Sequence, residues 1–170
     1  MNEGVIEGEG YAVGHIDQMG ERYGFRKIRQ ELGVTAFGVN AIAIPPGYET
    51  GRHFHDEQEE VYFCHRGRIE IEFGDGTAHP LEPGGAARVD AATVRKVRNA
   101  SDEDAVYVVV GGKDGYVGRD GRLPEGEERF GGSGPPGGHC SRPAGCDPRQ
   151  LYPRPAGPAD GVRPRAQRVP

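Results

Sequence analysis

The sequence predicts an all-β fold of the antiparallel sandwich or barrel type. Short apolar runs recur along residues 21–120, and Gly or Pro turn signals separate them at close intervals. No helical amphipathic pattern in this stretch is longer than a turn or two. Gly (29) and Pro (14) are abundant, and hydrophobic residues make up only 35% of the 170 residues. This composition excludes a helical bundle and favours one turn-rich β domain.

Each expected strand is bounded by residues that end it. Residues 34–44 are rich in β-branched side chains and stop at a Pro-Pro-Gly sequence, through which neither a helix nor a central strand continues. Residues 68–73 alternate strictly between polar and apolar, which is typical of a strand with one buried face. The expected strands are, in chain order, 11–16, 25–29, 34–44, 52–55, 60–65, 68–73, 77–81, 86–89, 93–98 and 105–110.

The composition divides the chain into three parts. Residues 1–20 form an acidic, Gly-rich N-terminal segment with one possible edge strand, and residues 21–120 form the β-barrel. Residues 121–170 are a Gly/Pro/Arg-rich tail. From about residue 131 this tail holds 9 of the 14 Pro and too few apolar residues to offset its ordering entropy, so we expect disorder there.

Charge and hydropathy exclude several functions. The net charge is −9 over residues 1–130 and +4 over residues 131–170. An acidic domain is a poor ligand for phosphate backbones, so no nucleic-acid partner is expected. No apolar run reaches 18 residues, and the N-terminus lacks the basic start and apolar core of a secretory signal. Three Cys do not form a disulfide framework. We therefore expect a cytoplasmic protein without a membrane partner.

The densest chemistry lies in residues 47–67. His53 and His55 are two apart, so on a strand both imidazoles lie on one face, roughly 6.6–6.8 Å apart along the chain. The polar run 56–59 is a plausible connection, and an antiparallel return would bring Glu60 to face them. Two imidazoles and one carboxylate suit zinc-like ions and non-haem iron(II). We interpret these three residues as metal ligands, against the alternative of a solvated turn.

This stretch resembles the first motif of the cupin superfamily, G-x5-H-x-H-x4-E-x6-G. All five fixed positions match over 21 residues, at Gly47, His53, His55, Glu60 and Gly67. The resemblance covers about residues 25–112. It implies a double-stranded β-helix barrel of the jelly-roll type, with a divalent metal held inside by the two His and the Glu. Iron, manganese, nickel and zinc all suit that donor set.

The second motif of that family, G-x5-P-x-G-x2-H-x3-N, is altered. Aligned on Asn99, the sequence keeps Gly84, but Arg95 stands where the third metal-binding His would be. A second register, anchored on residues 83–85, places Arg88 there instead. We prefer the first register because it keeps the Asn. A guanidinium has no acceptor atom and stays protonated, so it does not ligate a metal.

Two hypotheses of function assign different roles to Arg95. In the first, His53, His55 and Glu60 hold an ion with open positions, and Arg95 grips a small anionic substrate. Oxygenase, isomerase and lyase chemistries occur on similar barrels, and no catalytic residue is predicted. In the second, Arg95 pairs with Glu60 and replaces the metal, and the barrel binds a small acid or sugar-like ligand.

A third interpretation is a barrel retained for oligomerisation. Val61 and Phe63 lie opposite the Glu60 face, so both faces of that strand are apolar, and one needs a partner. We expect a homodimer, as in many similar proteins.

Two further residues are predicted to line the ligand site. Tyr62 lies on the Glu60 face, although Tyr on strands more often packs. Asn40 interrupts an apolar run and is either a donor to the ligand or a core residue bonded to the backbone. Cys64 is expected to be a small buried filler beside Tyr62.

Overall fold

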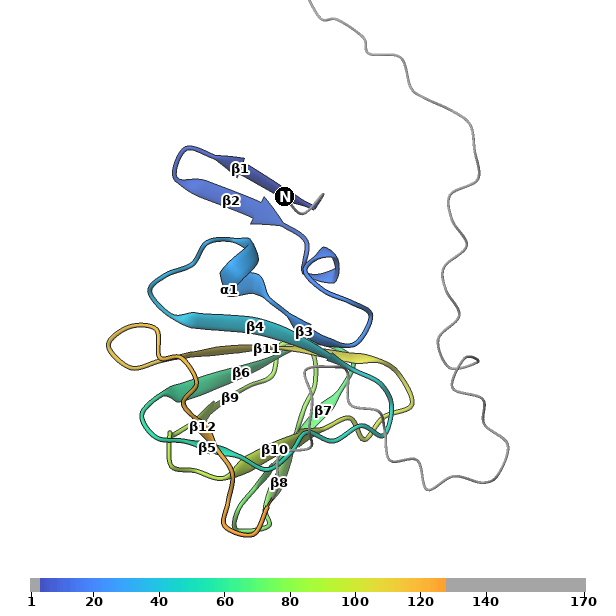
Figure 1. Ribbon diagram of the computed structural model, residues 1–170. Coiled ribbons are helices and arrows are strands. Elements are labelled where there is room, and N and C mark those ends of the chain that lie inside the picture. Colours follow the sequence, from blue (N-terminus) through green and yellow to red (C-terminus); the bar gives the residue numbers. More distant parts are fainter. Residues whose placement is uncertain (1–3, 128–170) are drawn as a thin grey trace, which may run out of the picture. The chain divides into compact units, whose positions relative to one another are not determined.

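The computed structural model describes residues 4–127, and two antiparallel sheets dominate them (Figure 1). The larger sheet has the strand order β3-β4-β11-β6-β9, and the smaller has the order β10-β7-β8. The predicted all-β, jelly-roll fold class is therefore confirmed. The strands are β3 (Gly24–Arg26), β4 (Gly38–Ile44), β6 (Glu59–Arg66), β7 (Ile69–Phe73), β8 (Ala78–Leu81), β9 (Ala86–Val89), β10 (Arg95–Arg98) and β11 (Ala105–Gly112).

The main core lies between the two sheets. It takes alternate side chains from both, because successive strand residues point to opposite faces. These buried core residues are Ile42, Ile44, Tyr62, Cys64, Ile69, Ile71, Val89, Val97, Ala105 and Tyr107. The predicted burial of Cys64 is confirmed, since it is a fully buried free cysteine.

A second apolar cluster covers part of the outer face of the larger sheet. Val39, Ala41 and Ala43 of β4 point outward and pack against Met19 and Ile28. Ile28 begins the one-turn helix α1 (Ile28–Glu31), which lies against β4 (Figure 1). Because β4 is buried on both faces, its sequence is almost uniformly apolar.

The N-terminal segment is more ordered than expected. A hairpin pairs β1 (Val5–Gly8) with β2 (Tyr11–Gly14), and the short 3-10 helix η1 (Ile16–Gln18) follows. The strand expected over 25–29 ends at Arg26. The buried Arg26 guanidinium donates hydrogen bonds to the carbonyls of Gly20 and Arg22, and the chain then turns into α1.

The outward-facing side chains of β6 are exposed to solvent. Its burial alternates as predicted, with Glu60 and Tyr62 inward and Val61 and Phe63 outward, 41% and 42% exposed. The homodimer expected at this face stays a prediction, as does a cytoplasmic location. None of the helices within residues 4–127 has the length and apolar character to span a bilayer.

Strand pairing continues past the expected end of the barrel at residue 120. The two-residue strand β12 (Gly121–Arg122) pairs antiparallel with β5 (Phe54–His55), with Gly121 opposite His55. The segment just before β12 therefore lies beside the predicted metal ligands. The disorder predicted from about residue 131 lies outside the described residues.

Candidate metal centre

Two strands that follow each other along the chain, together with an isolated bridge, position the predicted ligands. His55 ends β5, and Glu60 lies at the start of β6. His53 precedes β5 and forms an isolated antiparallel bridge with Arg95 of β10. Each residue of the bridge donates its N–H to the carbonyl of the other, over 3.0 and 2.9 Å. The ring centroids of His53 and His55 are 5.4 Å apart, as expected for side chains on one strand face.

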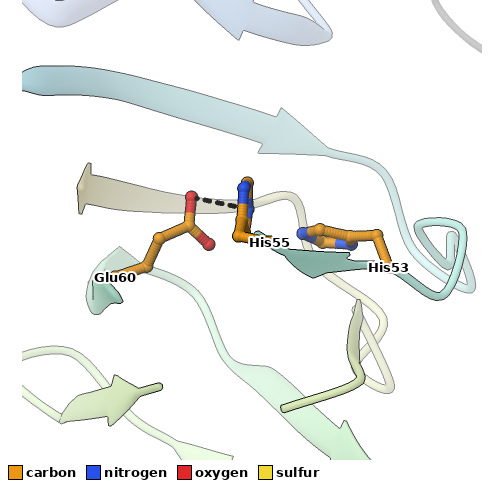
Figure 2. A group of neighbouring side chains, drawn as sticks. All are labelled: His53, His55 and Glu60. Carbon is orange, nitrogen blue, oxygen red and sulfur yellow. Dashed lines mark ion pairs between the residues drawn. The ribbon is translucent and has the colours of Figure 1, made fainter. Parts of the chain in front are cut away.

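The three side chains converge on one point. His53, His55 and Glu60 each offer a ligand atom, and these atoms lie within 4.8 Å of one another. Figure 2 shows the Glu60 carboxylate directed toward His55, with His53 on the far side of His55. Oε1 of Glu60 lies 3.3 Å from Nε2 of His55, an ion-pair distance. The structure thus brings together the three residues that the sequence motif singles out.

The nitrogen atoms that face this point are free to bind an ion. Nε2 of His55 is buried and makes no hydrogen bond within residues 4–127, because its contact with Glu60 lacks hydrogen-bond geometry. A buried polar atom without a partner is costly. Nδ1 of His53 lies 3.2 Å from the Gly51 carbonyl, so its Nε2 remains available. The donor set and the orphaned nitrogen both fit a divalent cation.

Burial favours the neutral form of one imidazole. Desolvation lowers the pKa of His53, and the Arg95 charge acts in the same direction. A neutral imidazole is the form that binds a metal.

Arg95 and Tyr62 hold the second oxygen of Glu60. Nη2 of Arg95 donates to Oε2 over 2.8 Å, and the Tyr62 hydroxyl donates to the same oxygen over 2.6 Å. Arg95 Nε also donates to the Tyr62 oxygen over 3.2 Å, and its Nη1 donates to the carbonyls of Ala91 and Thr93. The carboxylate is therefore fixed through Oε2, while Oε1 faces the histidines.

These contacts set the protonation of the pair. Burial alone would raise the pKa of Glu60, but the contacts with His55, Tyr62 and Arg95 outweigh it and lower the pKa to about 2. Burial, together with the Glu60 charge, raises the pKa of Tyr62. Glu60 is thus an anion at neutral pH, and Tyr62 remains a hydrogen-bond donor.

A family model for the cupin domain matches residues 41–111, which contain the three convergent residues. The chain carries a cupin domain. The family predicted from the motif spacing is therefore confirmed, and the finding agrees with the two-sheet fold.

The chain is also similar to several solved structures. A protein of Thermus thermophilus is 22% identical, with a TM-score of 0.52, over 62% of this chain and 98% of that one. A cupin-superfamily sugar phosphate isomerase of Silicibacter pomeroyi is 26% identical, with a TM-score of 0.49, over 62% of this chain and 60% of that one. A predicted oxalate decarboxylase of Thermotoga maritima is 22% identical, with a TM-score of 0.41, over 44% of this chain and 64% of that one.

The likeness to the Thermus thermophilus protein concerns the fold alone. The chain spans 60% of the length of the Silicibacter protein. No curated protein matches the sequence.

The structure settles the register of the second cupin motif. Arg95 bridges to His53, whereas Arg88 lies on β9 with an exposed side chain that pairs with Glu59. Asn99 is buried, and its side-chain amide donates to the carbonyls of Ile44 and Glu103. The register aligned on Asn99 is correct, so an arginine occupies the position of the third histidine.

The predicted substrate contacts of Arg95 and Tyr62 gain no support from this arrangement. Arg95 is 0% exposed and Tyr62 is 2% exposed, and both are engaged by Glu60. Asn40 is half-buried on the core face of β4, in register with Val109. Among residues 4–127 its amide makes no hydrogen bond. Its role as a ligand donor therefore stays a prediction.

Two residues beside His55 escape sequence reasoning. The amide Nε2 of Gln58 lies 2.9 Å from His55 Nδ1, and Oδ2 of Asp120 lies 3.6 Å from the same atom. Burial raises the pKa of Asp120, but hydrogen bonds from backbone N–H groups outweigh this and lower it. Asp120 follows the last expected strand, and no local pattern marks it as a neighbour of His55.

Proposed function

We propose that this cupin binds one divalent transition-metal ion through His53, His55 and Glu60 and acts as a small metal-dependent enzyme on an anionic substrate. The observation that carries the proposal is the convergence of the three ligand atoms around the orphaned, buried Nε2 of His55. A bound ion of this kind supplies Lewis acidity or activates water or O₂. Iron, manganese, nickel and zinc suit the ligands, and oxygenase, isomerase and lyase reactions all fall within the proposal.

The charges around the site support an anionic substrate. Arg95 already offsets the charge of Glu60 at 2.8 Å. A dication held by the three ligands therefore keeps a net positive charge, even when the buried Asp120 carboxylate behind His55 is counted. In a poorly solvated site this charge attracts an anion. Arg95 contributes by neutralising Glu60, without touching the substrate.

The test is the metal content of protein purified without a histidine tag. We expect about one equivalent of a transition metal in the wild type and almost none in His53→Ala. His65→Ala is the matched control, because His65 is exposed on the opposite face of β6. It should keep the metal. Absence of metal from the wild type, even after divalent ions are added back, would refute the proposal.

A second candidate function is a metal-free, ligand-binding cupin in which Arg95 replaces the ion. The Arg95–Glu60 ion pair supports it, since it places a permanent cation beside the ligand set. Arg95→Met discriminates the two functions. If Arg95 replaces the metal, this variant gains zinc binding that the wild type lacks. If the metal site is real, the wild type binds zinc as well.

A further inference from the structure

We propose that Asp120 is a positioning residue that holds His55 with its proton on Nδ1 and the lone pair of Nε2 directed at the metal site. The inference rests on the proposed metal-binding function. Asp120 lies outside residues 41–111, the segment matched by the cupin model. The positioning residue therefore comes from the part of the chain that follows the matched segment.

The connection between His55 and Glu60 is tied to Asp120 at three points. Oδ2 of Asp120 accepts hydrogen bonds from the backbone N–H groups of Glu57 and Gln58, over 3.1 and 2.9 Å. The backbone carbonyl of Asp120 accepts a hydrogen bond from the Asp56 N–H over 3.4 Å. The pairing of β12 with β5 sets Gly121 opposite His55. A single buried residue thus fixes the loop that separates two of the ligands.

Two carboxylates compete for the proton of His55. Glu60 lies 3.3 Å from Nε2, and Asp120 lies 3.6 Å from Nδ1. The charge of Glu60 is already offset by Arg95. Asp120 is bonded to backbone N–H groups and has no Arg or Lys partner among the described ion pairs of residues 4–127. The negative charge of Asp120 is therefore less compensated than that of Glu60. Because Asp120 lies beside Nδ1, its charge favours a proton on that nitrogen.

Gln58 completes the arrangement. Its nitrogen Nε2 lies 2.9 Å from Nδ1 and in this orientation donates to it, whereas the 3.6 Å from Nδ1 to Asp120 is too long for a hydrogen bond. A half-turn of the amide exchanges Nε2 for Oε1 and moves no other heavy-atom position. With Oε1 toward the ring, Gln58 accepts the Nδ1–H that Asp120 favours. Buried groups behind a ligating histidine fix its tautomer in this way in metal sites generally.

The experiment combines nitrogen NMR with zinc binding. Long-range ¹H–¹⁵N spectra of ¹⁵N-His protein report the tautomer of His55 without metal, and calorimetry with Zn²⁺ alone reports the affinity. In the wild type we expect a protonated Nδ1. Asp120→Asn keeps an oxygen for the backbone N–H groups but removes the charge. We expect it to shift the proton toward Nε2 and weaken zinc binding by about 10-fold or more.

Two further variants make the result interpretable. Asp56→Asn is the matched control, because Asp56 is an exposed carboxylate in the same loop, paired with Arg122. It should leave both the tautomer and the affinity unchanged. Gln58→Met removes the amide and keeps Asp120. It should weaken zinc binding even if Asp120→Asn fails to fold.

The outcomes separate this inference from the metal proposal. A wild-type proton on Nε2 overturns the inference. Zinc binding that is equal in wild type, Asp120→Asn and Gln58→Met also overturns it and leaves the metal site standing. A wild type that binds neither zinc nor any other added divalent ion, but whose Nδ1 proton moves in Asp120→Asn, supports the role of Asp120 and refutes the metal function.

Discussion

The two faces of strand β10 carry the same kind of ion pair in opposite surroundings. Arg95 points inward and meets Glu60 at 2.8 Å, with side chains 0% and 10% exposed. Arg98 points outward and meets Glu70 at 2.6 Å, with side chains 39% and 19% exposed. The outer pair is the shorter of the two. Water can replace either partner of the outer pair, whereas neither partner of the inner pair can be rehydrated in place.

This difference shows that the distance between two charges does not by itself indicate how much the pair contributes to the stability of the fold. The attraction between charges is screened near water and strong in the interior, where an unpaired charge is also most costly. Arg95 also donates hydrogen bonds to the Tyr62 hydroxyl and to two backbone carbonyls. The inner pair therefore belongs to the candidate metal centre, and the outer pair belongs to the solvated surface.

The largest expected effect comes from removing the inner cation. Arg95→Leu leaves the Glu60 carboxylate buried without its permanently charged partner, so we expect a loss of about 3–5 kcal/mol in the free energy of unfolding. Urea denaturation of the metal-free protein measures this loss. A loss below about 1 kcal/mol would mean that the inner pair behaves like the outer one.

Acid should break the inner pair next. The pKa of Glu60 is about 2 in the folded protein, against an ordinary value of 4.5. Because the folded pKa is lowered, the stabilisation is fully present above pH 4.5 and is lost as the pH falls through 2. From these values the contribution is about 3 kcal/mol. Unfolding of Glu60→Gln between pH 7 and 2 should lack this acid-dependent component, and an unchanged profile would contradict the assignment.

A bound metal ion should stabilise the protein through the other carboxylate oxygen of Glu60, and removing the ion should remove this stabilisation. Free ion at about 100 times its Kd should stabilise the wild type by about 2.7 kcal/mol, since binding favours the folded state. Thermal unfolding with zinc and with chelator measures this effect. His53→Ala should unfold at the same temperature in both conditions. An equal zinc effect in that variant would place the ion elsewhere.

The smallest effect is expected on the outer face. Arg98→Leu should cost no more than about 1 kcal/mol, and the loss should shrink as salt is added, because exposed pairs are screened. Parallel urea titrations at low and high salt check both points. A cost comparable to that of Arg95→Leu would remove the contrast between the two faces.

Local spacing predicted much of the site. The His-x-His pair lies on one strand face because the side-chain period of a strand is two, and β6 buries Glu60 and Tyr62 and exposes Val61 for the same reason. The strand positions from residue 34 to residue 110 were also predictable, since alternation and turn residues act within a few positions of each other.

Elements whose stability depends on distant residues escaped prediction. The helix α1 replaces the end of an expected strand because Ile28 finds an apolar partner surface on β4. Strand β12 is only two residues long and exists through its pairing with β5. No local pattern distinguishes such a segment from a loop.

The sequence by itself determined the all-β class, the cupin family, the three converging side chains of the candidate metal site and the arginine in place of a third histidine. Only the tertiary structure decided that Arg95 grips Oε2 of Glu60 and leaves Oε1 to the histidines. It also decided that Asp120 stands behind His55. The physical reason is that spacing along one strand fixes which side chains share a face, whereas contacts between remote segments depend on how strands pair and pack.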